Sequence, residues 1–192
     1  MRKFITKHIP ASQFISVGKC LILFMIIFSF AACTEYTKVL KSRDADYKFE
    51  YAKKAYDQKK YQQAITLLGD VIQPLRGSEK GEEALFLLGM SHYENKDYMN
   101  SGVYFKTYYT RYPKGKYAEL ARYYSGYGYY LDSPDPQLDQ TSTVKAIEEL
   151  QGFLDYFPRS DKVTLAFQKL HFEQESLYQS EGNSQENLVI PQ

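Results

Sequence analysis

The chain has 192 residues, with 24 Lys and Arg against 23 Asp and Glu, so its formal net charge is only +1. This balance offers no basic patch, and we expect no nucleic-acid partner. Two cysteines are too few for a disulfide framework, whereas aromatic residues are abundant, with 19 Tyr and 12 Phe but no Trp.

The first 32 residues have the layout of an export signal. Residues 1–19 carry four basic residues and no acidic one, and residues 20–32 are apolar apart from Ser29. A membrane-spanning helix needs roughly 20 apolar residues, so this run is too short for a comfortable permanent span. The sequence therefore predicts a signal peptide over residues 1–32.

The signal ends in Phe30-Ala31-Ala32-Cys33, which resembles the lipobox of bacterial lipoproteins. This resemblance implies that Cys33 is acylated and becomes the new N-terminus, followed by a lipidated linker over residues 33–44. Two or three acyl chains make a stable membrane tether. The alternative is an ordinary secretory signal cleaved after an Ala-x-Ala-like site. Cys20 leaves with the signal, so a lipidated mature chain has no thiol for a disulfide, a metal or a nucleophile.

A repeat of 37 residues runs through the rest of the chain. Shifting the sequence by this period superposes three sets of residues: Phe49, Phe86 and Tyr123; Ala52, Gly89 and Gly126; Tyr56, Tyr93 and Tyr130. A fixed period of this length is typical of a solenoid, and the apolar spacing inside each unit is helical. We predict an all-α solenoid of about three helical hairpins, in which the small residues let paired helices approach closely.

Prolines and an insertion mark the expected helix ends. Pro113 and Pro158 should end the second helices of units two and three, because proline lacks an amide hydrogen. Unit three is longer than the others, and residues 131–143 read as a loop with two prolines. Asp139 or Thr141 is expected to cap the helix that follows.

The pattern resembles the tetratricopeptide repeat, whose usual marks appear in unit two as Gly89, Tyr98, Phe105 and Pro113. Two departures stand out: Arg76 occupies the place of the proline in unit one, and the signature Trp is missing throughout. The resemblance implies a fold of paired helices that serves as a binding scaffold.

Beyond the repeats we expect one further helix over residues 161–178 that caps the solenoid. Its apolar residues either pack or remain exposed: Phe167, Leu170 and Phe172. We assign residues 45–178 to the tetratricopeptide repeat domain and residues 179–192 to a disordered tail.

The lipobox, the repeats, SerProAspProGlnLeuAspGln at 133–140 and AlaIleGluGluLeuGlnGlyPheLeuAspTyrPheProArgSer at 146–160 together resemble the BamD family of outer-membrane assembly lipoproteins. The resemblance implies a lipid-anchored protein of the outer membrane facing the periplasm. Its implied partners are a BamA-like barrel protein, other assembly subunits and unfolded outer-membrane proteins. Members of this family carry more repeats, so we expect a C-terminally shortened member, and the contact with BamA is in question.

We expect no enzyme, metal or cofactor, because no phosphate-binding loop, metal motif or nucleophile elbow is present. His92 falls inside a helix and is expected to be structural. The adjacent pairs Glu82-Glu83 and Glu148-Glu149 are expected to be solvated faces rather than an acid/base pair.

The first helices of the repeats are expected to line a groove that binds peptides. Its candidate residues are Phe49, Tyr56, Phe86, Met90, Tyr93, Tyr123, Tyr127 and Tyr130. For Phe49, Phe86 and Tyr123 packing between helices is an equal alternative, whereas the other tyrosines favour the groove because a phenol hydroxyl prefers access to water. By family resemblance the ligand is the aromatic-ended targeting segment of an unfolded barrel protein. A generic tetratricopeptide lipoprotein and a glycan-binding envelope lipoprotein remain alternatives.

Overall fold

The computed structural model describes residues 35–186, and every regular element in that range is a helix. The predicted signal peptide and the lipidation site Cys33 lie outside the described residues. The chain divides after Arg43 into two units. The first unit contains a short helix over residues 35–41, within the segment predicted as a linker.

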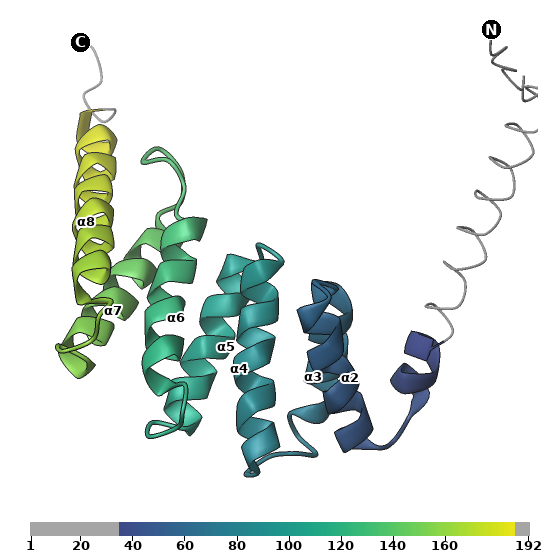
Figure 1. The fold of residues 1–192 in the computed structure, drawn as a ribbon. Coiled ribbons are helices and arrows are strands. Elements are labelled where there is room, and N and C mark those ends of the chain that lie inside the picture. The colour runs from purple at the N-terminus through teal and green to yellow at the C-terminus, as the bar shows by residue number, and fades with distance from the viewer. Residues whose placement is uncertain (1–34, 187–192) are drawn as a thin grey trace, which may run out of the picture. The chain divides into compact units, whose positions relative to one another are not determined.

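The second unit contains all of the labelled helices (Figure 1). They are α2 (Ala45–Asp57), α3 (Tyr61–Val71), α4 (Glu79–Glu94), α5 (Tyr98–Arg111), α6 (Ala118–Asp132), α7 (Thr141–Tyr156) and α8 (Val163–Glu186). Helices that follow one another in the chain pack side by side, so α2/α3, α4/α5 and α6/α7 form hairpins and α8 packs on α7. This arrangement confirms the predicted solenoid of three helical hairpins and a C-terminal helix.

Short polar side chains begin several of these helices. Asp44 accepts a hydrogen bond from a backbone amide in the first turn of α2 at 3.0 Å, and Ser78 does the same for α4 at 3.1 Å. At the end of the insertion, Asp139 accepts from the amide of Thr141 at 2.8 Å. The N-cap residue of α7 is Gln140, whose side chain makes no capping hydrogen bond, so neither residue of the predicted pair is the N-cap.

The helix ends repeat along the chain. Helices α5 and α7 end shortly before Pro113 and Pro158, as predicted. The turns inside the first two hairpins contain Lys59 and Lys96, one period apart, with left-handed backbone φ angles of 59° and 61°. The 37-residue period is therefore present in the backbone as well as in the side chains.

The predicted close approach of paired helices occurs at two glycines. A Cβ atom on Gly89 would lie 2.8 Å from the ring of Phe105, and one on Gly126 would lie 2.8 Å from Leu150 Cγ. In both hairpins the first helix thus presents bare backbone to a large side chain of the second helix. Any larger residue at these positions would push the two helices apart.

Helix α8 differs from its predicted boundaries. It extends to Glu186, so the tail assigned to residues 179–192 is helical up to that residue, and the remaining residues lie outside the described range. Glu and Gln, which favour helices, are frequent in this segment, and the single Gly182 does not interrupt it. Of the apolar residues in question, Leu170 is buried, whereas Phe167 and Phe172 are 62% and 61% exposed.

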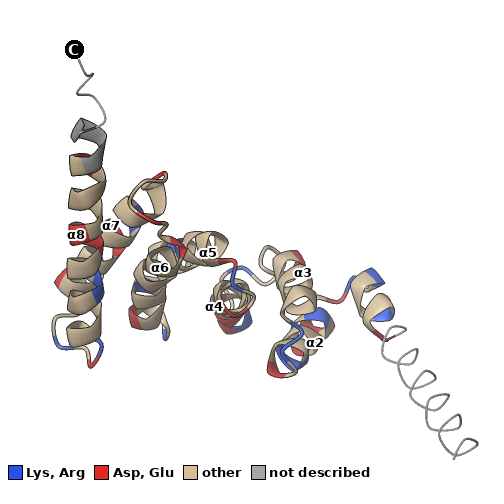
Figure 2. Ribbon diagram, turned by 90° about the horizontal axis from the view of Figure 1, so that it is seen from above, with Lys and Arg blue, Asp and Glu red and all other residues tan. Residues whose placement is uncertain are grey.

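Charged residues of both signs are spread along the helices (Figure 2). Several form ion pairs between neighbours: Lys48 contacts Asp70 on α3 at 2.6 Å, and Lys53 contacts Glu83 on α4 at 3.1 Å. Within the described residues, none of the helices combines the length and apolar character that a membrane crossing requires.

Candidate functional site

Three of the eight predicted groove residues lie in the core. Phe49, Phe86 and Tyr123 are only 1%, 8% and 4% exposed. The ring of Phe86 contacts Phe105 on α5 at a centroid distance of 5.6 Å, and that of Tyr123 contacts Phe153 on α7 at 5.5 Å. These two side chains point at the second helix of their own hairpin. The assignment of all three to a peptide groove is therefore corrected in favour of helix packing.

Three other predicted residues come together in a row of rings. Tyr93 on α4 and Tyr127 on α6 have ring centroids 6.3 Å apart, and Tyr130 stacks on Tyr127 at 5.7 Å. Phe172 on α8 meets Tyr130 edge-on at 5.9 Å. We call Tyr93, Tyr127, Tyr130 and Phe172 the aromatic run. The three tyrosines are half-buried, so each retains a solvent-facing part.

The two remaining candidates are Tyr56 on α2 and Met90 on α4. Tyr56 packs edge-on against Tyr61 in its own hairpin, with centroids 5.7 Å apart, and Met90 is half-buried on α4. Burial, aided by the nearby charge of Glu94, raises the pKa of Tyr56 to about 12. Tyr56 is thus a neutral phenol at physiological pH, but it is not a member of the aromatic run.

Sequence reasoning missed three contributors to this surface. Tyr124 lies 5.2 Å from Tyr93, ring centroid to centroid, and its spacing of three residues from Tyr127 was a usable signal for a shared helix face. Phe172 and Lys169 were missed because the repeat pattern fades before them. These two residues are also three positions apart on a helix, but no earlier unit has an equivalent to compare with them.

Lys169 places a positive charge against the aromatic run. Its Nζ donates a hydrogen bond to the hydroxyl of Tyr130 at 3.2 Å and lies 4.4 Å from the centre of the same ring. The ring of Tyr127 is 5.9 Å from this nitrogen. A cation over aromatic faces is stabilised by their quadrupoles. The surface therefore combines apolar ring area with one cation able to pair with a carboxylate.

The phenol of Tyr93 is held in its neutral form. Burial, followed by the neighbouring Tyr127, raises the pKa of Tyr93 well above its usual range. A neutral, half-buried tyrosine offers a large contact area and one hydrogen-bonding tip. Such a row suits extended chains with apolar side chains and does not require one particular sequence.

A cavity of about 360 Å³ adjoins the α8 end of the run. It lies between the proline-containing insertion and α8, and Phe172 belongs to both the cavity and the run. The insertion contributes Pro134 and Pro136, and α8 contributes Glu175 and Gln179. An aromatic side chain fits a space of this size between rigid prolines and a ring.

Two glutamates that were predicted to be solvated accept hydrogen bonds from tyrosines on other helices. Glu149 is 6% exposed, and its Oε2 accepts a hydrogen bond from the hydroxyl of Tyr109 at 2.5 Å. Glu82 likewise accepts from the hydroxyl of Tyr108 at 2.5 Å. The prediction failed because the partners lie on other helices, far away in sequence. The neighbour Glu148 is exposed, as expected.

His92 holds a turn. Its Nδ1 lies 2.8 Å from Oδ2 of Asp97, and its ring stacks on Tyr104 at a centroid distance of 4.9 Å. These contacts connect the end of α4 to the start of α5, which is a structural role. Among residues 35–186, no group of His, Cys, Asp and Glu is arranged to hold a metal ion.

Comparison with known proteins gives a match to a protein family. A family model, YfiO, described as outer membrane lipoprotein, matches residues 41–184. No curated protein matches the chain. The matched range contains all of α2–α7 and most of α8, and therefore the whole aromatic run.

Proposed function

Since this chain belongs to the YfiO family of outer membrane lipoproteins, we propose that it is a non-catalytic scaffold subunit of the barrel-protein assembly (BAM) machinery. In this role it binds unfolded outer-membrane proteins and partner subunits and helps to insert the barrels into the outer membrane. The acylated Cys33 tethers the body, which faces the periplasm. A BamA-like barrel protein and other assembly subunits are its partners.

The aromatic run is the observation that carries the peptide-binding part of this proposal. Tyr93, Tyr127 and Tyr130 form one row of rings across two repeats, and Phe172 extends it onto α8. Unfolded barrel proteins are extended chains with frequent aromatic residues. Ring faces bind such side chains through apolar burial without selecting one sequence.

The α8 end of the aromatic run suits the C-terminal residue of a bound peptide. A peptide whose last residue is Phe brings an aromatic ring and a free carboxylate together. The cavity beside Phe172 accommodates the ring, and Lys169, one helical turn earlier, supplies the positive charge. The insertion of unit three thus acts as a wall of the binding site.

Binding of fluorescent peptides that end in Phe tests this site. We expect the double variant Tyr93→Ala/Tyr130→Ala of the full chain to bind roughly 10-fold more weakly, because hot-spot aromatics typically carry that much affinity. The matched control is Tyr178→Ala, since this tyrosine of α8 is 74% exposed and lies outside the run. Equal binding by the parent and the double variant would contradict the site.

Purification of the native lipoprotein from solubilised envelope, followed by mass spectrometry, tests the assembly role. Recovery of a BamA-like barrel protein is the expected result. Recovery of a different complex would favour a generic tetratricopeptide lipoprotein. Binding of oligosaccharides but not peptides would favour a glycan-binding protein, because tyrosine faces also stack on sugars.

A further inference from the structure

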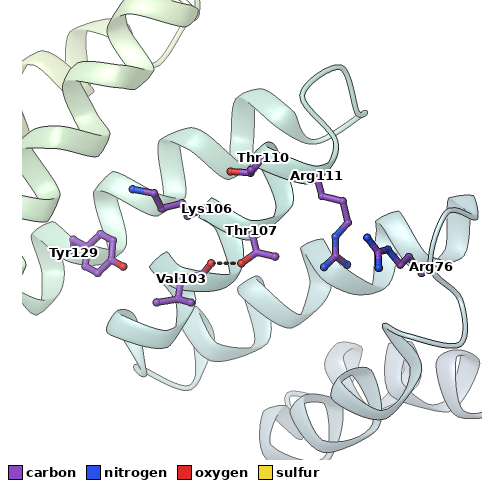
Figure 3. A pocket seen from close by; sticks show the side chains of 7 residues that line it. All are labelled: Arg76, Val103, Lys106, Thr107, Thr110, Arg111 and Tyr129. Atoms are coloured by element: carbon purple, nitrogen blue, oxygen red, sulfur yellow. Dashed lines mark hydrogen bonds between the residues drawn. The ribbon is translucent and has the colours of Figure 1, made fainter.

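A second hollow lies away from the aromatic run. Its volume is about 500 Å³, and five of its residues come from α5, the second helix of unit two (Figure 3). The residues that matter here are Val103, Lys106, Thr107 and Arg111 of α5, with Arg76 from the α3–α4 connection and Tyr129 from α6. The aromatic run, by contrast, lies on α4, α6 and α8. This hollow thus has its own wall and is separate from the proposed peptide site.

Two arginine side chains in the hollow lack a carboxylate partner among the described residues. Lys106 is neutralised, because its Nζ lies 2.8 Å from Oε1 of the buried Glu149. Arg76 and Arg111 have no ion-pair partner within residues 35–186, and their guanidinium groups point toward each other (Figure 3). Nη1 of Arg111 is shielded from solvent and makes no hydrogen bond there.

Such an arrangement is costly in the free protein. A buried donor without an acceptor loses its hydration and gains nothing in return, and two like charges facing each other repel. A carboxylate between the two groups relieves both costs at once. Arginine suits this role because its planar fork binds carboxylates with two parallel hydrogen bonds.

Arg76 also stands out in the repeat pattern. One period further on, the equivalent position is Pro113, which ends its unit as the repeat requires. Unit one therefore departs from the repeat at the residue that brings the second guanidinium into the hollow. Helix termination alone gives no reason for an arginine here.

We propose that this hollow binds an acidic segment of a partner protein, with Arg76 and Arg111 holding an Asp or Glu side chain. A peptide is favoured over a phosphate group because the wall also offers apolar contacts. The side chain of Val103 is 46% exposed. The hydroxyl of Thr107 donates a hydrogen bond to the backbone carbonyl of Val103 at 2.8 Å, so the methyl group of Thr107 is the part left for contact with a ligand. The proposal does not depend on the aromatic run.

The test measures binding of the full-length chain to a fluorescent ten-residue peptide that alternates Glu with Val and Ala. The expected result is binding that weakens roughly 10-fold in Arg76→Gln/Arg111→Gln and is intermediate in Arg76→Lys/Arg111→Lys. Lys114→Gln/Arg159→Gln is the matched control, with the same change of charge at exposed positions outside the hollow. The single variant Arg76→Gln keeps the test valid if the Arg111 variant fails to fold, because Arg76 lies in an exposed connection.

Three results would overturn the proposal. These are unchanged peptide binding in both Arg76→Gln/Arg111→Gln and Arg76→Gln, equal weakening by the Lys114/Arg159 control, or displacement of the peptide by millimolar inorganic phosphate or by vesicles containing phosphatidylglycerol. A parallel measurement with a neutral peptide ending in Phe separates this site from the proposed groove. The Arg76 variants should bind that peptide as the parent does.

Discussion

The carboxylate of Glu149 on α7 accepts a hydrogen bond from the hydroxyl of Tyr109 on α5 at 2.5 Å, and thereby joins the second helices of adjacent repeats. The other oxygen of this carboxylate lies 2.8 Å from Lys106 Nζ. Burial and then the bond to Glu149 raise the pKa of Tyr109 far above its usual range, so the phenol keeps its proton. Glu149 is only 6% exposed, and each of its two carboxylate oxygens has a hydrogen-bond partner.

Replacing Glu149 should destabilise the solenoid. We expect Glu149→Ala to lower the free energy of unfolding by about 3 kcal/mol, because the Tyr109 hydroxyl and Lys106 lose their acceptor inside the packed interface. Urea denaturation followed by circular dichroism measures this change. Glu148→Ala is the control, since its exposed carboxylate should contribute less than about 0.5 kcal/mol. Equal effects of the two substitutions would contradict the role given to Glu149.

Glu173 should make stability depend on pH. It is 1% exposed, and burial raises the pKa of its carboxyl above the ordinary value of 4.5, although Ser133 donates to it at 2.6 Å. A raised carboxyl pKa means that the folded state binds the proton more tightly than the unfolded state. Stability from this group is therefore greatest at low pH and falls as pH rises above 4.5.

The variant Glu173→Gln removes that titration while keeping an acceptor for Ser133. We expect it to be more stable than the parent by about 1 kcal/mol at pH 7.5, with the difference disappearing near pH 4. Thermal unfolding at a series of pH values provides the measurement. Glu181→Gln, at an exposed position of the same helix, is the matched control, and an equal effect of the two substitutions would contradict the role given to Glu173.

Two glycines in helices should respond to alanine in opposite ways. On Gly126 a Cβ atom would lie 2.9 Å from the backbone nitrogen of Leu150, so Gly126→Ala should cost about 2 kcal/mol or more. On Gly69 nothing lies within 4 Å, so Gly69→Ala should stabilise α3 by roughly 0.5–1 kcal/mol. The midpoints of urea denaturation of the two variants, compared with that of the parent, measure these changes in stability. A stability of Gly126→Ala equal to or above that of the parent would contradict this packing of the α6/α7 hairpin.

Lys169 should select peptides with a free C-terminus. We expect Lys169→Met to weaken binding of a Phe-ended peptide with a free carboxylate by roughly 5- to 10-fold, because the cation over Tyr130 is lost. The same peptide with an amidated end should bind the parent and the variant alike. Fluorescence anisotropy with both peptides gives the comparison. A loss that is equal for the two peptides would indicate that Lys169 supports the fold rather than the carboxylate.

The hairpins were predictable because their determinants repeat. Gly89 and Gly126 recur at one period and meet Phe105 and Leu150 as expected, and prolines follow α5 and α7. Each of these signals acts within one hairpin. Local spacing in the sequence was therefore enough to place the first six helices of the array.

The candidate site was only partly predictable, because it depends on contacts between repeats. Tyr93, Tyr127 and Tyr130 were recognised by their period, yet Phe86 and Tyr123 share that period and turn into the core. Helical periodicity gives the spacing of a face but not which neighbour covers it. Phe172 and the bond from Tyr109 to Glu149 involve helices distant in sequence, where no local pattern carries the information.

The order of contacts in the second unit has a mechanical consequence. Helices there pack mainly on those next to them in the chain, as in other solenoids. Such an array can bend elastically, because small rotations between successive hairpins add up along its length. The aromatic run crosses from α4 to α6 and then to α8, so a bend between hairpins would change the spacing of its rings. A chain bound along the run would thus resist stretching of the solenoid, and tension on the solenoid would loosen its hold on that chain.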